Sequence, residues 1–433
     1  MKIRNTRPRI LMLAPFCLEQ GNPEAIVNAN FAKALLRRGY VVDVLTAHFH
    51  STKYHYPLNE EADQRELGAI SHPISVPHGH SFGTYWLHCY SLLKTGHIYE
   101  GCQWAGKALD AARLLQRENH YDLIISRSSP AELVALRLAQ ACRIPWIATW
   151  NDPYPSEKYP EPYAHGPLSP LRQGKQSLLD SVAKHADWHI FPSARLMTYM
   201  QSYFPVDIAG RSSVVPHVFG EYVSAGSGAS QSAGRKCVLI HTGALLPPRF
   251  PDSLLEGLHR FVERDGVNPA SFELQLVGCR SEAVSNLARR LGISQFVTQP
   301  APMSYGDSLR AIAAAEIAVL VEADLAEGIF LPTKLVEYAR CRKPILAVSP
   351  RVGTAADLFA SHGGGVLAEP GSPDAIAACL SRLYASWSSG TLSREFDAFP
   401  LAQQFHESNV MPVVDGIVSA LLVGSSGERC EVA

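Results

Sequence analysis

The chain has 433 residues, more than one hydrophobic core usually supports, so we expect two domains. Hydrophobic residues make up 46% of the chain and charged residues 18%, which excludes a globally disordered protein. Lys and Arg number 39 against 40 Asp and Glu, which argues against a nucleic-acid-binding protein but leaves a local basic patch at a membrane open.

The chain begins with a strand, a helix and a second strand. Residues 9–14 form an apolar run typical of a buried parallel strand. Asn22 and Pro23 predict the N-cap and first residue of a helix that ends near Gly39, and residues 41–45 predict the next strand. A helix between two strands predicts a right-handed parallel crossover.

The alternation of strands and helices is lost between residues 48 and 100, where we expect irregular loops with one or two helices near 85–99. Alternation then resumes, with helices at 104–117, 131–142 and 171–185 and strands at 123–125, 146–149, 188–191 and 214–215. Residues 225–235 are rich in Gly, Ser and Ala, as in a linker.

The second half repeats the alternation of strands and helices, which predicts an α/β fold with a second parallel sheet. Its strands are expected at 237–241, 272–277, 296–297, 317–321, 344–348 and 365–367, and its helices at 252–264, 281–291, 305–314, 332–341, 355–361 and 373–384.

The cysteines indicate a reducing compartment. They number nine, an odd number, and include no C-x-x-C pair, so a disulfide framework is not expected. Acidic residues interrupt the most apolar long stretch, 311–331, and the basic start lacks the apolar core of a secretory signal. We therefore expect a cytoplasmic protein, with peripheral contact at the inner face of the membrane left open.

The loop after the strand at 317–321 has features of a phosphate site, since ligands of parallel sheets bind at the carboxyl ends of strands. With Pro332 as the first helical residue, the backbone N–H groups of Thr333 and Lys334 lack intrahelical partners, and a helix N-terminus attracts phosphate. Lys334 adds a cation, and Glu337 lies four residues after Thr333 on the same helix face, where it can accept hydrogen bonds from ribose hydroxyls. The alternative is an ordinary amphipathic helix with a solvent-side pair of Lys334 and Glu337.

The stretch from Gly328 to Tyr338, with Arg342-Lys343-Pro344 after it, resembles the donor-site signature of retaining GT-B glycosyltransferases of the group 1 or family 4 type. Weaker matches follow in the family's order: Gln20-Gly21-Asn22-Pro23-Glu24, Pro192-Ser193, Val215-Pro216-His217, Thr242-Gly243 with Arg249, and Leu276-Val277-Gly278.

The resemblance implies two Rossmann-like domains whose parallel sheets face a central cleft. We accordingly expect an acceptor-side domain at 1–220, a linker at 221–236, a donor domain at 237–389, and a segment 390–433 that packs back on the first domain. The activity implied is sugar transfer from a nucleotide-diphosphate sugar to the hydroxyl of a carbohydrate or lipid-linked acceptor, in polysaccharide or glycoconjugate biosynthesis. No metal and no cofactor are expected.

By the same resemblance, Arg249 and Lys334 neutralise the donor diphosphate, and Glu337 binds its ribose. The residues expected around the donor are Gly21, Gly243, Glu327, Thr333 and Glu337. A solvated surface arginine is the alternative for Arg249.

Two features depart from the family pattern. The family often carries two glutamates eight positions apart, whereas the residue eight before Glu337 is Ile329. Glu327 is two residues too early, although a loop could deliver it. The first glycine loop has Gly21 alone instead of a pair.

Two loops of the first half are candidates for acceptor binding. Asp152 follows the strand at 146–149 and is the candidate polar group near the acceptor hydroxyl, with an Asx-Pro turn as the alternative. The loop 126–130 either binds acceptor or caps the helix after it. The aromatic stretch 85–104 fits a membrane interface or a core.

Three other functions are alternatives to sugar transfer. A nucleotide-sugar epimerase would need acid and base residues on both sides of a sugar carbon, and the motif loops hold no compact carboxylate set. A dinucleotide-dependent oxidoreductase needs Gly-x-Gly-x-x-Gly between strand and helix, which the sequence lacks. A non-catalytic protein that binds sugar nucleotides stays open because of the missing glutamate.

Overall fold

The computed structural model describes residues 7–18, 22–49, 61–77, 82–97, 102–163, 172–224 and 236–425. Contacts divide the chain into two compact units. The first unit comprises Met1–Tyr159, Ala164–Gly220 and Glu407–Ala433, and the second comprises Pro160–Tyr163 and Glu221–His406.

The chain returns to the first unit at Glu407, whereas the returning segment was expected from residue 390. Helices α14 (Leu392–Glu395) and α15 (Phe399–Gln403) belong to the second unit because they pack on its other helices. The start of the expected linker is also part of that unit, since Arg340 Nε donates to the carbonyl of Glu221 at 2.7 Å. The rest of the expected linker, residues 225–235, lies outside the described residues.

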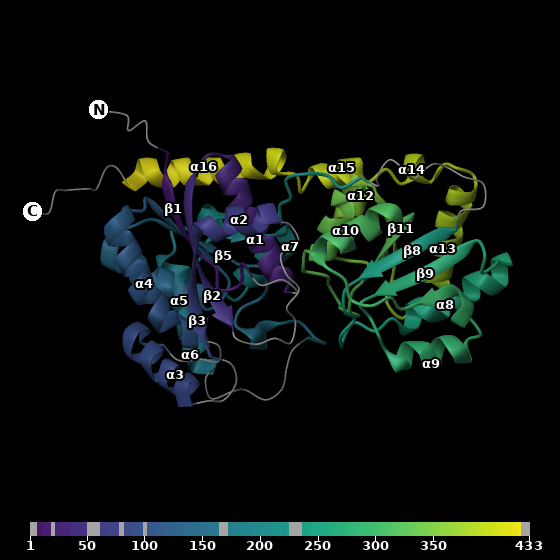
Figure 1. Cartoon of the computed structure of the whole chain (residues 1–433), viewed down its shortest axis with the longest axis horizontal. Coiled ribbons are helices and arrows are strands. Elements are labelled where there is room, and N and C mark those ends of the chain that lie inside the picture. The colour runs from purple at the N-terminus through teal and green to yellow at the C-terminus, as the bar shows by residue number, and fades with distance from the viewer. Residues whose placement is uncertain are drawn as a thin grey trace, which may run out of the picture. The chain divides into compact units, whose positions relative to one another are not determined.

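Within the described ranges, the first unit is built on a seven-stranded parallel sheet in the order β3-β2-β1-β4-β5-β6-β7 (Figure 1). Its interior strand β1 is apolar after Arg9, and Ile10 to Leu13 are fully buried. The strand order reverses between β1 and β4, the point where open α/β sheets bind ligands. The strands are β1 (Arg9–Leu13), β2 (Val41–Phe49), β3 (Ser71–Val76), β4 (Leu123–Arg127), β5 (Trp146–Thr149), β6 (Trp188–Phe191) and β7 (Ser212–Val214).

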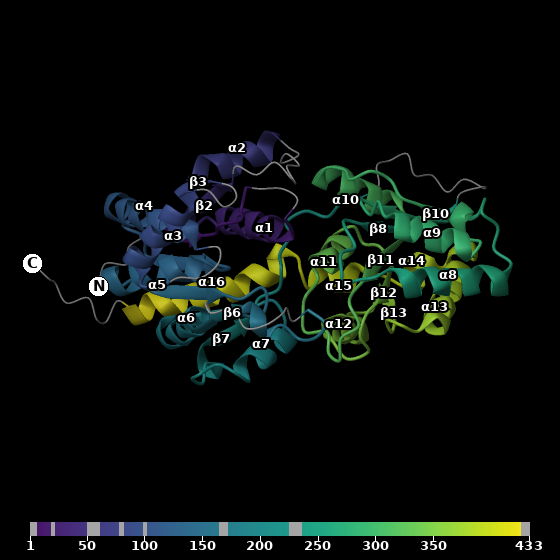
Figure 2. The same ribbon diagram turned by 90° about the horizontal axis from the view of Figure 1, so that it is seen from below.

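Helices cover both faces of this sheet, and α16 runs along the unit beside α1 (Figures 1 and 2). Asn22 caps α1 by accepting from Glu24 N at 3.0 Å. Arg37 at the end of α1 pairs with Glu407 of α16, and Tyr40 donates to Asp415 at 2.8 Å. The helices are α1 (Pro23–Arg37), α2 (Glu61–Ile70), α3 (Phe82–Thr95), α4 (Gln103–Asn119), α5 (Ala131–Cys142), α6 (Arg172–His185), α7 (Ala194–Gln201) and α16 (Glu407–Ser425).

The region expected to be irregular, residues 48–100, contains a strand and two helices that the sequence pattern missed or misplaced. β3 pairs with β2 in parallel from Val44↔Ser71 to Phe49↔Val76. Its signal in the sequence is weak because it is an edge strand, where a proline such as Pro73 is tolerated and few side chains are buried. Helix α3 ends at Thr95, before the expected end near residue 99.

The second unit has a six-stranded parallel sheet, among the described residues, in the order β10-β9-β8-β11-β12-β13. Its strand order reverses between β8 and β11, which places a second ligand-binding edge at the ends of those strands. The strands are β8 (Cys237–Thr242), β9 (Phe272–Val277), β10 (Val297–Thr298), β11 (Ile317–Val321), β12 (Ile345–Val348) and β13 (Gly365–Ala368).

Two long helices of the second unit, α8 and α13, pack tightly together (Figure 2). A Cβ at Gly257 would lie 2.5 Å from Ile376 Cγ2, so only glycine permits this approach. Besides α14 and α15, the helices are α8 (Asp252–Asp265), α9 (Glu282–Arg290), α10 (Tyr305–Ala314), α11 (Thr333–Arg340), α12 (Thr354–His362) and α13 (Pro373–Ser388).

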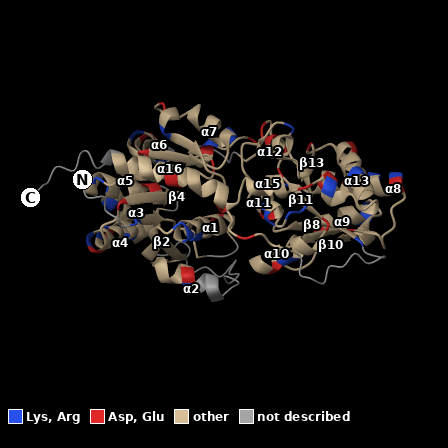
Figure 3. Ribbon diagram, turned by 90° about the horizontal axis from the view of Figure 1, so that it is seen from above, with Lys and Arg blue, Asp and Glu red and all other residues tan. Residues whose placement is uncertain are grey.

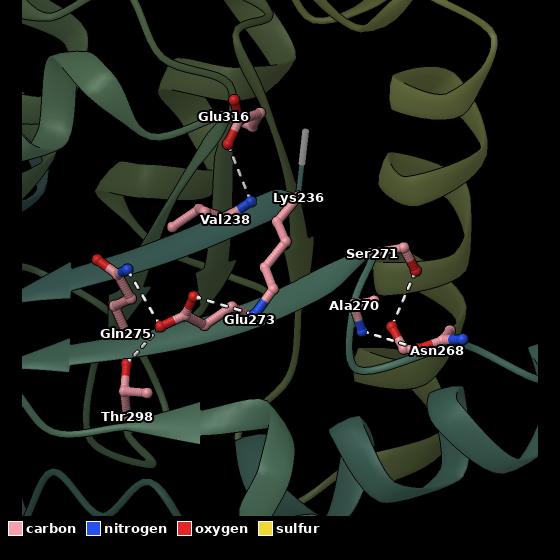
Figure 4. A network of polar contacts seen from close by, with 9 residues as sticks. All are labelled: Lys236, Val238, Asn268, Ala270, Ser271, Glu273, Gln275, Thr298 and Glu316. Atoms are coloured by element: carbon pink, nitrogen blue, oxygen red, sulfur yellow. Dashed lines mark hydrogen bonds and ion pairs between the residues drawn. The ribbon is translucent and has the colours of Figure 1, made fainter. Parts of the chain in front are cut away.

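A polar network ties the strands of the second sheet together near their amino ends (Figure 4). Glu273 on β9 accepts from Thr298 Oγ1 of β10 at 2.8 Å and lies 3.8 Å from Lys236 Nζ. Glu316, just before β11, accepts from the backbone N–H of Val238 at 2.9 Å. These contacts join the strands at the end of the sheet opposite to the carboxyl ends of β8 and β11.

Charged residues of both signs are interspersed over each unit (Figure 3). In the part of the chain that the structure describes, no helix combines the length and the apolarity needed to cross a bilayer. Within the same residues, no three His, Cys, Asp or Glu side chains stand close enough to hold a metal ion.

Candidate functional site

Two glycine turns end neighbouring strands of the second sheet. Gly243 follows β8 with φ +103° and donates from its backbone N–H to Val277 at 2.8 Å, and Gly278 follows β9 with φ +80°. A Cβ at Gly243 would lie 3.2 Å from Lys334 Cε. The glycine therefore lets the Lys334 side chain lie against the turn after β8.

Helix α11 begins at Thr333, one residue later than expected. Pro332 is its N-cap, with extended geometry at ψ 129°. The backbone N–H groups of Thr333 and Lys334 lie in the first turn of the helix and have no intrahelical acceptor. Thr333 is only partly buried. The helix thus retains two backbone donors at its positive end, as the sequence predicted for a phosphate site.

Lys334 and Glu337 form an ion pair, with Nζ 2.8 Å from Oε2. The pair does not lie on a solvent-facing side of the helix, because Glu337 is only 3% exposed. Its other oxygen, Oε1, is shielded from water and has no hydrogen-bond partner in the described structure. A buried acceptor without a donor costs about 1–3 kcal/mol, which a ligand hydroxyl reaching Oε1 would recover.

Arg249, in the loop after β8, and Lys334, in the first turn of α11, act on the same buried histidine. His241 lies on β8, and its Nδ1 is 3.0 Å from the carbonyl of Val319. Burial lowers the pKa of His241 to about 4, and the charges of Lys334 and Arg249 lower it as well. The two cations expected at the donor diphosphate therefore converge at the end of β8. Arg249 Nε is buried without a described partner.

Glu322, directly after β11, is a candidate that sequence reasoning missed. It is 8% exposed, and Ser349 Oγ donates to its Oε2 at 2.5 Å. Burial raises the pKa of Glu322 to about 7, while the Ser349 hydrogen bond and the charge of Arg249 oppose the rise. In the sequence it only interrupted an apolar run, although an acid directly after a buried strand is itself a signal.

The loop between β11 and α11 is held in place by a close approach of two glycines. The backbone N–H of Thr354 donates to Gly328 at 2.7 Å, and a Cβ at Gly353 would lie 2.9 Å from Gly328 Cα. Ile329, at the position of the family's first glutamate, is 1% exposed. Glu327 is exposed on the same loop.

In the first unit, Asp152 lies in the loop that follows β5. It is exposed, yet the protein around it displaces enough water to raise the pKa of its carboxyl to about 6, and a hydrogen bond from Tyr159 opposes the rise. The neighbouring Asn151 Nδ2 lies 3.4 Å from Glu24 Oε1 and 3.5 Å from Ser128 Oγ. Asp152 therefore adjoins residues that follow β1 and β4.

Glu24, in the first turn of α1, is a second acid at this edge. Burial raises its pKa to about 8, the charge of Asp152 raises it further, and Arg127 and Asn151 lower it. Its carboxyl is therefore mostly protonated at pH 7. The expected glycine Gly21, three residues earlier, lies outside the described residues.

Arg127 ends β4 and is 3% exposed. Its Nε donates to Asn28 Oδ1 at 2.8 Å, and its guanidinium lies 4.5 Å from the ring centre of Phe31. The loop after it was expected to bind acceptor or to cap α5. The N-cap of α5 is Pro130, with no side-chain capping bond.

Comparisons with known proteins agree with this architecture. Residues 25–216 match the family model described as a glycosyl transferase 4-like domain. HepE from Anabaena in complex with UDP and glucose is 17% identical, with a TM-score of 0.63 over 96% of this chain and 100% of that chain. Sucrose-phosphate synthase from Thermosynechococcus elongatus is 14% identical, with a TM-score of 0.68 over 96% and 100%.

A third solved structure, the apo form of the lipopolysaccharide outer core galactosyltransferase WaaB, is 15% identical, with a TM-score of 0.57 over 95% of this chain and 99% of that chain. No curated protein matches the chain by sequence. At these identities the likeness to solved structures establishes the fold.

Proposed function

Because this chain has the GT-B fold and belongs to the glycosyl transferase 4-like family, we propose that it moves a sugar from a nucleoside-diphosphate sugar to an acceptor hydroxyl, with retention of configuration. The family and the fold expected from the sequence are thereby confirmed. The observation that carries the proposal is the buried Glu337 beside Lys334 at the start of α11, with one carboxylate oxygen unpartnered.

The donor diphosphate is assigned to the end of β8 and the start of α11. The N–H groups of Thr333 and Lys334 bind its oxygens, and the side chains of Lys334 and Arg249 neutralise it. Charge that develops on the leaving nucleoside diphosphate is stabilised by these cations, so the transfer needs no metal ion. HepE has been solved with UDP and with UDP-glucose, which supports UDP as the first probe.

Acceptor binding is assigned to the first unit, with Asp152 hydrogen-bonded to the reacting hydroxyl. The pKa of about 6 keeps most of this carboxyl ionised at pH 7, where it accepts that hydrogen bond. The acceptor class proposed is a carbohydrate or a lipid-linked sugar.

We expect Glu337→Gln to weaken UDP binding by about ten- to a hundredfold, because a hydrogen bond to a charged group contributes about 1.5–3 kcal/mol. Isothermal titration with UDP measures the effect, and melting temperature reports folding. Glu282→Gln, an exposed acid in the first turn of α9, is the matched control. Unchanged UDP affinity in Glu337→Gln would show that α11 is only structural, and the donor-site assignment would fall.

The activity itself is tested by incubating the protein with a panel of nucleotide sugars and carbohydrate or lipid-linked acceptors, with EDTA present. Transfer to acceptor supports the proposal. UDP binding without turnover of any donor would instead identify a sugar-nucleotide-binding protein. Activity lost in EDTA and restored by manganese would contradict the metal-independent mechanism.

We propose further that α3 contacts the membrane that carries a lipid-linked acceptor. Phe82, Trp86 and Leu93 are 89%, 57% and 80% exposed, and Tyr85 is 61% exposed. Their spacing of three, four and seven residues places these apolar groups on one side of the helix. Aromatic and aliphatic side chains on one face are typical of helices that lie in a membrane interface.

The double variant Trp86→Ser with Leu93→Ser is expected to bind phospholipid vesicles at least about tenfold more weakly, since each buried side chain contributes about 1.5–3 kcal/mol. Cosedimentation with vesicles of phosphatidylglycerol and phosphatidylethanolamine measures this. Leu246→Ser, also 57% exposed but in the second unit, is the control. Equal sedimentation of the parent and the double variant would refute membrane contact by α3.

A further inference from the structure

Arg127 is a buried cation without an anionic partner in the part of the chain that the structure describes. It is 3% exposed, and Nε is the only guanidinium nitrogen with a hydrogen bond to a described residue, the 2.8 Å bond to Asn28. Asn28 is fully buried and is itself oriented by donating from Nδ2 to the carbonyl of Phe16 at 2.7 Å. The face of Phe31 supports the guanidinium from one side. Packing therefore holds Arg127 in one orientation, while its two terminal nitrogens have no hydrogen-bond partner among the described residues.

The acids near Arg127 do not compensate its charge. Among the described residues, no carboxylate forms an ion pair with Arg127, and Glu24 is the carboxyl whose charge acts on it. Burial raises the pKa of Glu24 to about 8, so this carboxyl is mostly neutral at pH 7 and can donate a hydrogen bond. Burial also lowers the pKa of Arg127, to about 10, which still leaves it charged. Burying an unpaired charge costs several kcal/mol, and a bound anion would offset that cost.

Arg127 also stands where a ligand is expected from the topology. It is the last residue of β4, whose neighbour in the sheet is β1, and the strand order reverses between these two strands. Glu24 lies in the first turn of the helix after β1, so both side chains border the same switch point. Arg127 and Glu24 belong to the first unit, whereas Arg249 and Lys334 belong to the second.

We propose that Arg127 is the centre of an anion site that binds an acidic group of the acceptor, a phosphate or a carboxylate. This inference rests on the proposed function, because it names the class of acceptor: a sugar or lipid-linked sugar that carries a negative charge next to the part that is glycosylated. Nη1 and Nη2 form the fork that pairs with two oxygens of a phosphate or carboxylate. The protonated Glu24 supplies a further donor.

The test measures binding of inorganic phosphate, glucuronate and neutral glucose to the full-length protein by isothermal titration. Saturating UDP is present so that the donor-side cations are occupied, and ionic strength is held constant. Arg127→Gln removes the charge, and Arg117→Gln, an exposed arginine of α4, is the matched control. We expect Arg127→Gln to weaken binding of the acidic probes by about ten- to a hundredfold. Arg117→Gln should bind them like the parent.

A second pair of variants keeps the test decisive if Arg127→Gln folds poorly. Ser128 has φ +67°, a backbone conformation that Asp and Asn both tolerate. Ser128→Asp adds a negative charge beside the site, and Ser128→Asn has nearly the same shape without it. We expect Ser128→Asp to bind the acidic probes at least about tenfold more weakly than Ser128→Asn, because a nearby carboxylate repels them.

The outcomes separate the two sources of anion and the two proposals. Phosphate binding alone identifies a phosphorylated or lipid-phosphate acceptor, and glucuronate binding alone identifies an acidic sugar. If no acidic probe binds the parent, or the charged and neutral variants bind alike, the anion site is refuted. Failure of UDP to bind while Arg127-dependent anion binding persists would refute the donor site and leave this inference standing.

Discussion

Lys334→Ala is expected to lower kcat by about a hundred- to a thousandfold, the typical loss when one group that stabilises transition-state charge is removed. Lys334 lies against the turn at Gly243 and at the start of α11, where the leaving diphosphate is assigned. Its charge matters most as the sugar–phosphate bond breaks, so the loss should fall on turnover more than on donor binding. Steady-state kinetics with varied donor concentration separates the two effects.

The same substitution removes the partner of a buried carboxylate, since Lys334 Nζ is 2.8 Å from Glu337 Oε2. A buried charge left unpaired destabilises the fold, so the melting temperature of Lys334→Ala should fall. The double variant Lys334→Ala with Glu337→Gln removes both charges and should recover the melting temperature without recovering kcat. Recovery of kcat in the double variant would mean that the loss came from misfolding, and the catalytic role of Lys334 would be refuted.

The parallel architecture of both units could be predicted because apolar runs followed by capped helices mark buried strands and crossovers. Asn22 and Pro23 marked the start of α1 correctly. β3 escaped detection for a physical reason. It is an edge strand with a proline and mostly half-exposed side chains, so burial imposes no strong pattern on its sequence. The returning segment was placed too early because nothing in its sequence distinguishes α14 and α15, which pack on the second unit, from α16.

The candidate site could be predicted from the sequence only where its residues stand close together in one motif. Lys334 and Glu337 could be singled out because they lie within the signature at 328–338, in the first turns of one helix. The loop 126–130, which contains Arg127, was a candidate for acceptor binding, but Arg127 itself could not be singled out because the lack of a described counterion is a property of its three-dimensional surroundings. In the sequence, Glu322 only interrupted an apolar stretch. Its burial beside Ser349, which the structure shows, raises the pKa of its carboxyl to about 7.

Glu132 is a buried acid on which no cation of the described residues acts, and only a backbone hydrogen bond opposes the effect of its burial. It lies in the first turn of α5, is 2% exposed, and its Oε2 has no hydrogen-bond partner in the described structure. Burial raises the pKa of Glu132 from 4.5 to about 8. Above pH 4.5 the unfolded chain therefore releases a proton that the folded protein retains. The stability associated with this group is full below pH 4.5 and is lost as the pH rises towards 8.

Because glutamine cannot ionise, Glu132→Gln is expected to be more stable than the parent at pH 8, by on the order of 2 kcal/mol in free energy of unfolding, and close to it at pH 5. Urea unfolding followed by tryptophan fluorescence measures this for the first unit, which contains all six tryptophans except Trp387. Glu118→Gln, an exposed acid of α4, is the control and should show no such difference. A Glu132→Gln variant that gains no stability over the parent between pH 5 and pH 8 would show that this carboxyl is already ionised in the folded protein, with a compensating donor beside it.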